Sequence, residues 1–130
     1  MASRDITDCV PELQEFWPLL RDRYKLLFPN RELFLTCTHR SQQEQAALFA
    51  KNTEHNIITR CDGIKKLSKH NYFPAKAFDV GIKLRGLVVW DNGYFMPLGR
   101  VLRELDKEGH IRWGGEFSFF DGPHFEAING

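Results

Sequence analysis

Cysteine is scarce in this chain. The 130 residues contain three cysteines, Cys9, Cys37 and Cys61, and none of them belongs to a Cys-x-x-Cys pair. An odd number of cysteines without paired spacing predicts neither a disulfide framework nor a thiolate zinc site. We therefore expect small, buried or half-buried thiols in a protein that folds in a reducing compartment.

Long apolar runs are lacking as well. No segment is long enough to span a bilayer, and residues 1–8 contain no apolar stretch of the kind that a signal peptide needs. These absences predict a protein made in the cytoplasm, without a signal peptide and without stable membrane association. If its substrate lies outside the cytoplasmic membrane, another factor must permeabilise that membrane.

The chain also lacks an excess of charge. Lysine and arginine total 18 and aspartate and glutamate total 17, which gives a net charge of +1. The two signs are interspersed, so no strong field would attract nucleic acid. With 42% hydrophobic, 13% aromatic and 27% charged residues, the composition is that of a globular protein. We expect one domain, residues 1–130, without a second module, acting as a monomer.

The N-terminal part has helical periodicity. Between about Thr7 and Leu27 the apolar residues fall along one broad helical face. Asp8 is the candidate N-cap, Pro11 lies in the first turn, and Pro18 is expected to kink or divide the helix. This apolar face predicts core packing and carries no chemistry.

The remainder alternates strands, helices and loops. Ser41 and Glu44 form a capping box that predicts a helix to about Ala50, and a polar loop follows. A second helix is predicted over 97–108, before Gly109. Runs of β-formers predict strands at residues 33–38, 77–82, 110–113 and 124–126, and a hairpin over 87–96 around Asn92-Gly93. This order predicts an α+β domain, a small antiparallel β-sheet flanked by helices.

Two stretches carry the residues that point to chemistry. His70 lies on a loop, Asp79 lies in the apolar strand that follows, and His124 follows Pro123 near the C-terminus. A carboxylate in an apolar strand needs a partner that offsets its desolvation, and a metal ion would be one. Two imidazoles and one carboxylate are a ligand set that holds zinc and leaves a position for water. Asp121, three residues before His124, is then a candidate proton acceptor beside that water.

Four motifs carry a resemblance to a known family. They are a Ser-x-His opening at Ser68, an Ala-x-Asp close at Ala77, a Trp-Gly-Gly at Trp113, and an Asp-x-Pro-His-Phe-Glu ending at Asp121. In this order they resemble the VanY-like or M15 zinc peptidases, which include D,D-peptidases, L-alanyl-D-glutamate peptidases and many phage endolysins. The resemblance runs from about Leu33 to the last motif, which is nearly the whole chain.

The resemblance implies a fold and a set of roles. The fold is that of the D,D-peptidases and of the Hedgehog domain. The ligands of one zinc ion per chain would be His70, Asp79 and His124. The catalytic base would be Asp121. Glu126 is the rival base, but as it lies two residues after His124 on a strand, it suits a hydrogen-bond partner of that imidazole better.

Three more residues are candidates for contact with substrate. Arg40 matches the family's arginine in the segment that resembles Thr-x-x-x-Arg-Ser, and its guanidinium suits an oxyanion or a substrate carboxylate; the alternative is a surface salt bridge. Ser68 would bind substrate or only cap a turn. Trp113 would floor the cleft or only fill the core.

The first motif departs from the commonest family form. That form, Ser-x-His-x-x-Gly-x-Ala-x-Asp, is shorter, whereas here residues 73–76 stand in the middle and His70 and Asp79 are nine positions apart. A loop absorbs two extra residues at little cost, so both side chains still reach one ion. The zinc prediction therefore stands, and the longer loop bears on subfamily and on the bond that is cut.

We expect a zinc peptidase of murein, of the phage endolysin type, that cuts the L-Ala–D-Glu bond of the peptidoglycan stem peptide. Within the same class the alternative is a D-Ala-D-Ala carboxypeptidase. Outside it, the alternative is a murein-binding or virion structural module that keeps the fold without turnover. The intact set of His70, Asp79, Asp121 and His124 argues against the last of these.

Overall fold

The long N-terminal helix supplies one wall of the core. The computed structural model describes residues 2–128, and in it α1 runs over Pro11–Leu27. Its buried side chains are Leu13, Phe16, Trp17, Leu20 and Tyr24. The predicted apolar face is therefore present, and Pro18 lies within one undivided helix. The predicted N-cap is wrong: Val10 holds that position, and Asp8 ends a separate 3₁₀ turn, η1, over Ile6–Asp8.

Within residues 2–128, five antiparallel strands form the sheet. They are β1 (Arg31–Cys37), β2 (Ala77–Leu84), β3 (Leu87–Val89), β4 (Ile111–Trp113) and β5 (His124–Ala127). The main order is β1-β2-β5-β4, and β3 pairs with the second half of β2. Because β2 contacts β1 along one edge and both β5 and β3 along the other, it is the central strand.

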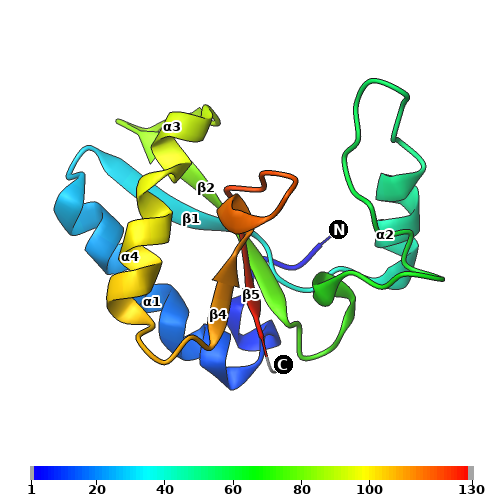
Figure 1. Cartoon of the computed structure of the whole chain (residues 1–130), viewed down its shortest axis with the longest axis horizontal. Coiled ribbons are helices and arrows are strands. Elements are labelled where there is room, and N and C mark those ends of the chain that lie inside the picture. Colours follow the sequence, from blue (N-terminus) through cyan, green and yellow to red (C-terminus); the bar gives the residue numbers. More distant parts are fainter. Residues whose placement is uncertain (1, 129–130) are drawn as a thin grey trace.

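Helices α1 and α4 (Pro97–Leu105) cover one face of this sheet. α1 packs against β1 and against α4, which in turn contacts β4 (Figure 1). Between helices and sheet, Phe78 and Phe125 stack with ring centroids 5.5 Å apart, and Phe16 lies 5.8 Å from Phe125. Since successive side chains of a strand point to opposite faces, Asp79 points away from this core.

The opposite side of the sheet faces an arm of the chain. The arm begins with α2 (Gln42–Phe49), whose N-terminus has the predicted capping box of Ser41 and Glu44, and continues as an irregular loop to residue 67. Figure 1 shows α2 on the side of the sheet away from α1 and α4. None of the helices among residues 2–128 combines the length and apolarity needed to cross a membrane.

Two predictions about the region 85–109 are wrong. The hairpin turn is formed by Arg85 and Gly86, whose φ angles of 50° and 85° suit a two-residue turn between β2 and β3. Asn92–Phe95 is instead a short helix, α3, which buries Phe95 in the core. Likewise α4 ends at Leu105 instead of residue 108, because the Asp106 carboxylate accepts hydrogen bonds from the backbone of the segment that leads into β4.

Candidate active site

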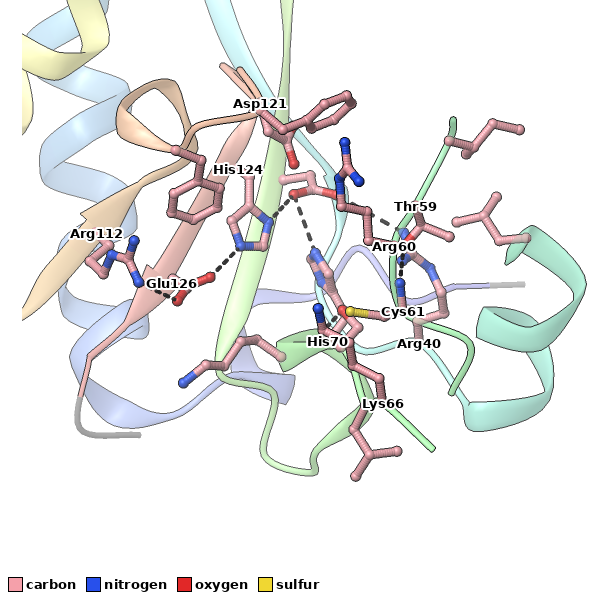
Figure 2. A pocket seen from close by; sticks show the side chains of 18 of the residues that line it. Arg40, Thr59, Arg60, Cys61, Lys66, His70, Arg112, Asp121, His124 and Glu126 are labelled. Atoms are coloured by element: carbon pink, nitrogen blue, oxygen red, sulfur yellow. Dashed lines mark hydrogen bonds and ion pairs between the residues drawn. The ribbon is translucent and has the colours of Figure 1, made fainter. Parts of the chain in front are cut away.

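A cleft of about 760 Å³ lies between the uncovered face of the sheet, the arm and the loop that precedes β5. Its lining includes four of the residues predicted from the motifs: His70, Asp79, Asp121 and His124 (Figure 2). The sequence places these residues on three separate segments, and the fold brings them to one place.

The strand register sets two of them side by side. Asp79 on β2 pairs directly with His124 on β5, so both side chains project from the same face of the sheet. The Oδ1 atom of Asp79 lies 3.0 Å from Nδ1 of His124. His70 approaches the same oxygen from the arm side, with Nε2 at 3.2 Å.

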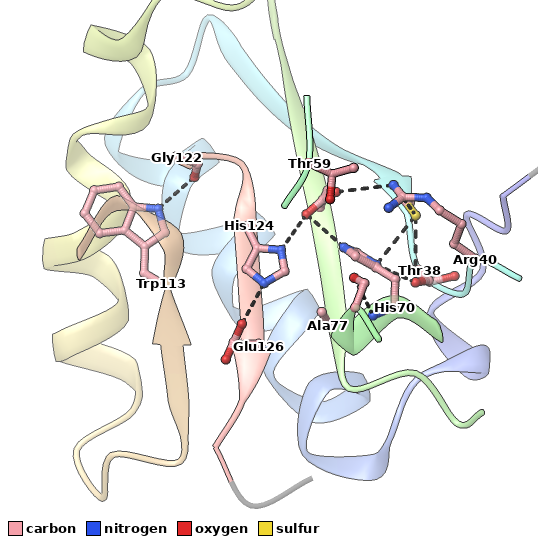
Figure 3. Close-up of polar contacts among 12 residues, drawn as sticks. Thr38, Arg40, Thr59, His70, Ala77, Trp113, Gly122, His124 and Glu126 are labelled. Carbon is pink, nitrogen blue, oxygen red and sulfur yellow. Dashed lines mark hydrogen bonds and ion pairs between the residues drawn. The ribbon is translucent and has the colours of Figure 1, made fainter. Parts of the chain in front are cut away.

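Hydrogen bonds at the far nitrogens determine how each imidazole is protonated. Nδ1 of His70 lies 2.7 Å from the carbonyl oxygen of Thr38, which only accepts, so this nitrogen carries the proton. Nε2 of His124 donates in the same way to Glu126 Oε1 at 2.9 Å (Figure 3). In the neutral tautomers fixed by these bonds, both remaining nitrogens point lone pairs toward Asp79.

This geometry fits a cation. One nitrogen of each imidazole flanks Asp79 Oδ1, and His70 Nε2 is buried without a well-aligned hydrogen bond among the described residues. Burial alone would lower the pKa of both imidazoles, but the adjacent Asp79 carboxylate outweighs it and raises the pKa of His70 to about 10 and that of His124 to about 9. Beside Asp79 each ring therefore binds a second proton at neutral pH. A cation that displaces these two protons would meet an N, N, O donor set, which is one that zinc accepts.

Cys37 gives a second candidate ligand set. One ligand atom each of Cys37, His70 and Asp79 lie within 4.8 Å of one another. However, Sγ of Cys37 lies 3.6 Å from Nδ1 of His70, the nitrogen that already donates to Thr38. The thiol is thus beside the His70 nitrogen that is turned away from Asp79, and we favour the set that contains His124.

Asp121 is held next to His124 by backbone contacts. Its N–H donates to the Gly114 carbonyl at 2.9 Å, and its carbonyl accepts from the N–H of His124 at 3.1 Å. A Cβ on Gly114 would overlap the Asp121 carbonyl oxygen, which gives the Trp-Gly-Gly motif a steric reason. Burial, and then the charge of Asp79, raise the pKa of Asp121 above the usual aspartate value.

Glu126 lies where the strand alternation predicts. It is on the same face as His124, 8% exposed, and is hydrogen-bonded to that imidazole. Burial opposes ionisation of its carboxyl, but the hydrogen bond from His124 outweighs burial and lowers the pKa of Glu126. An ionised carboxylate here fixes the ring orientation of His124.

Arg40 lies at the edge of the cleft and is fixed by a residue that the sequence analysis missed. Its Nη1 donates to Gln45 Oε1 at 2.9 Å and its Nη2 to Cys37 Sγ at 3.3 Å, and Nη2 lies 4.0 Å from Asp79 Oδ2. Gln45 is fully buried in α2. The capping box next to Gln45 predicted the helix but not the contact with Arg40. A glutamine on a short polar helix normally faces solvent, so burial of Gln45 was not expected.

The two remaining candidates have different positions. Ser68 lines the cleft and also caps the 3₁₀ turn η2 (Lys69–Asn71), where its Oγ accepts from the His70 N–H. Trp113 is not in the cleft wall: it is 5% exposed, and its indole donates to the Gly122 carbonyl at 2.7 Å. Its bulk and its hydrogen bond place Trp113 in the core, behind the loop that carries Asp121.

An antiparallel sheet with one helix-covered face, and a cleft with a candidate cation site on the other, are features expected of a metal-dependent hydrolase. A family model described as D-alanyl-D-alanine carboxypeptidase, from the M15 peptidases, matches residues 62–127. The match includes all four residues of the centre named above. The chain belongs to the M15 family, and it is a metallopeptidase of the class that hydrolyses peptidoglycan peptides.

A solved structure supports the fold. The crystal structure of the Serratia marcescens L-Ala D-Glu endopeptidase ChiX superposes with a TM-score of 0.64 at 23% identity. The match covers 98% of this chain and 89% of that chain. The α+β architecture of the M15 fold is therefore confirmed. No curated protein matches the sequence.

Proposed function

We propose that this chain is a zinc-dependent endopeptidase that cuts the L-Ala–D-Glu bond of the peptidoglycan stem peptide. The observation that carries the proposal is the contact of two imidazole nitrogens with the Asp79 carboxylate, with the Asp121 carboxyl group in the same cleft.

In this proposal His70, Asp79 and His124 hold one zinc ion. When bound, zinc acts as a Lewis acid and lowers the pKa of a coordinated water to about 7. The hydrogen bonds to Thr38 and Glu126 keep each imidazole in the tautomer and orientation that binding needs.

Proton transfer is assigned to Asp121. Its carboxylate accepts a proton as water attacks the scissile carbonyl, and then delivers that proton to the leaving amine. Burial raises the pKa of Asp121, which favours its protonated form and suits the acid role of the second step.

Arg40 is assigned to the carbonyl oxygen. Its guanidinium is held by Gln45 and Cys37 at the edge of the cleft, close to Asp79. A fixed positive charge there stabilises the oxygen as it becomes negative in the transition state. Ser68, on the arm side of the cleft, is a further candidate for binding the substrate backbone.

The choice of bond rests on two supports. The motifs resemble those of phage endolysins, and the similar crystal structure is that of an L-Ala D-Glu endopeptidase. The second candidate is a D-alanyl-D-alanine carboxypeptidase, which the description of the matching family model favours. We further propose a monomer of one domain that reaches murein as a phage endolysin, after the membrane is permeabilised.

The test is mass spectrometry of fragments released from purified Gram-negative murein, with the protein alone and with a metal chelator. New termini at L-Ala and D-Glu that appear only without chelator would support the endopeptidase. Muropeptides shortened by one D-Ala would support the carboxypeptidase instead. No new termini in either sample would contradict both.

A further inference from the structure

The arm wall of the cleft is anchored at two points next to Arg60. Gln45 Nε2 donates to Thr59 Oγ1 at 3.0 Å and to the Cys61 carbonyl at 2.9 Å. Asn52 donates to the Thr59 carbonyl at 2.7 Å and accepts from its N–H at 3.2 Å. The backbone on both sides of Arg60 is therefore tied down, although the segment has no regular structure.

Arg60 extends from this wall across the mouth of the cleft. Its guanidinium carbon lies 5.0 Å from the centroid of the Phe119 ring, on the loop that carries Asp121. Figure 2 shows the Arg60 side chain reaching toward that loop. The aromatic contact between the two walls limits the rotamers of a long side chain, so less entropy is lost when it binds an anion.

The charge of Arg60 has no carboxylate partner. Within residues 2–128, no carboxylate oxygen lies within ion-pair distance of Arg60, whereas Arg112 on the opposite wall approaches Glu126 at 3.9 Å. Lys66, also in the arm wall, likewise has no carboxylate within ion-pair distance among residues 2–128. The arm side of the cleft thus presents positive charge that the protein itself does not neutralise.

The position of Arg60 relates it to one side of the scissile bond. Phe119, which it contacts, is two residues before Asp121, and Asp121 is the residue assigned to protonate the leaving amine. Arg60 and Asp121 line the same cleft, so in the proposed reaction the Arg60 charge would lie on the side of the residue that contributes the amine. In an L-Ala–D-Glu bond that residue is D-Glu, whose α-carboxylate is free because the stem peptide continues through its γ-carboxyl.

We infer that Arg60 is a specificity-determining residue that binds a substrate carboxylate on the amine side of the scissile bond. The inference rests on the proposed endopeptidase function. It identifies the preferred substrate as a stem peptide with a free D-Glu α-carboxylate, and a peptide in which that carboxyl is amidated as a poor one.

The experiment measures cleavage of two synthetic peptides by zinc-loaded protein. One is L-Ala-γ-D-Glu-L-Lys, and the other is the same peptide with the α-carboxyl group of D-Glu amidated. We expect the wild type to cleave the free acid with a kcat/KM about tenfold or more above that of the amide, mainly through KM, because a charged hydrogen bond is lost in the amide. Arg60→Ala should lower kcat/KM for the acid to the level of the amide, and Arg60→Lys should restore part of the preference. Arg103→Ala, which removes an exposed arginine of α4, is the matched control and should behave as wild type.

Equal cleavage of both peptides by the wild type, or an unchanged preference in Arg60→Ala, would overturn the inference and leave the endopeptidase intact. Calorimetric binding of the free-acid peptide separates the remaining cases. Binding without cleavage that is weakened by Arg60→Ala would keep the carboxylate site and contradict the proposed activity. Neither binding nor cleavage by the wild type would overturn both.

Discussion

At the scale of single residues, the proposed proton transfer depends on the Asp121 carboxylate. Asp121→Asn keeps the size of the side chain and its backbone contacts to Gly114 and His124. We expect it to retain zinc and to lose hydrolysis by a factor of about 100 to 10,000, the usual contribution of a general base. The check is kcat of the zinc-loaded variant, together with its metal content.

Glu116 supplies the matched control. It is an exposed carboxylate of the same loop and also lines the cleft. Glu116→Gln removes the same charge and should stay within a few-fold of wild-type activity. If Asp121→Asn were fully active, or if both variants lost activity equally, the base would not be Asp121.

The two candidate ligand sets differ in a single residue. If His124 is a ligand, His124→Ala should bind zinc well below one ion per chain, and Cys37→Ser should remain close to one. The measurement is elemental analysis after dialysis against a weak chelator, with circular dichroism to verify that each variant is folded. Loss of zinc in Cys37→Ser but not in His124→Ala would reverse the assignment.

The four residues at the middle of the cleft could be predicted from the sequence. The residues that hold or flank the cleft wall, Gln45 and Arg60, could not. His70, Asp79, Asp121 and His124 lie in motifs, and the structure brings all four to one cleft. Gln45 and Arg60 belong to no motif, because their contacts join segments whose spacing in the chain is irregular. Trp113 was ambiguous since a tryptophan in a Gly-rich motif suits a core as well as a cleft.

At the scale of elements, the loop between β4 and β5 positions Asp121, the proposed base. Gly114→Ala would place a Cβ against the Asp121 carbonyl oxygen and close to the His124 side chain. We expect a loss of activity of about 100-fold, because displacement of a catalytic group by about 1 Å has an effect of this size. The measurement is kcat/KM on the free-acid peptide at saturating zinc.

Gly93→Ala is the control for this substitution. Gly93 lies in α3, and a Cβ there would meet no atom within 4 Å. Alanine also favours helix more than glycine does, so this variant should be as active and at least as stable as wild type. Full activity in Gly114→Ala would contradict the steric account of the Trp-Gly-Gly motif.

Elements were predictable where periodicity or a cap was strong. The face of α1 and the capping box of α2 are local patterns, and both are present. The hairpin at Asn92-Gly93 was not formed because burial of Phe95 in the core competes with local turn preference. The turn at Arg85-Gly86 requires an arginine at positive φ. This conformation is uncommon for residues other than glycine, so the local sequence does not predict the turn.

At the scale of the whole molecule, the reactivity of the cysteine thiols measures how well the folded core excludes solvent. Burial, and then the charge of Asp8, raise the pKa of Cys9 to about 12, while Cys61 is only partly buried. At pH 8 we expect a thiol reagent to modify Cys61 first, and Cys9 only as fast as the chain unfolds, because the thiolate is the reactive form. Peptide mass spectrometry of a labelling time course measures this; labelling of Cys9 as fast as Cys61 in the folded protein would contradict the packing described.

The division of the sheet into two faces organises the molecule. The face under α1 and α4 carries the aromatic core, and the other face carries Asp79 and His124. The sequence predicted an α+β domain and the strands involved, but not the register that pairs these two residues. Register depends on long-range packing, which a single sequence does not display.

X-ray absorption spectroscopy at the zinc edge tests the central claim most directly, on wild-type protein loaded with one zinc ion. Coordination by His70, Asp79 and His124 predicts only nitrogen and oxygen scatterers, at about 2.0–2.2 Å, with imidazole multiple scattering. A sulfur scatterer at about 2.3 Å would identify Cys37 as a ligand and contradict the account.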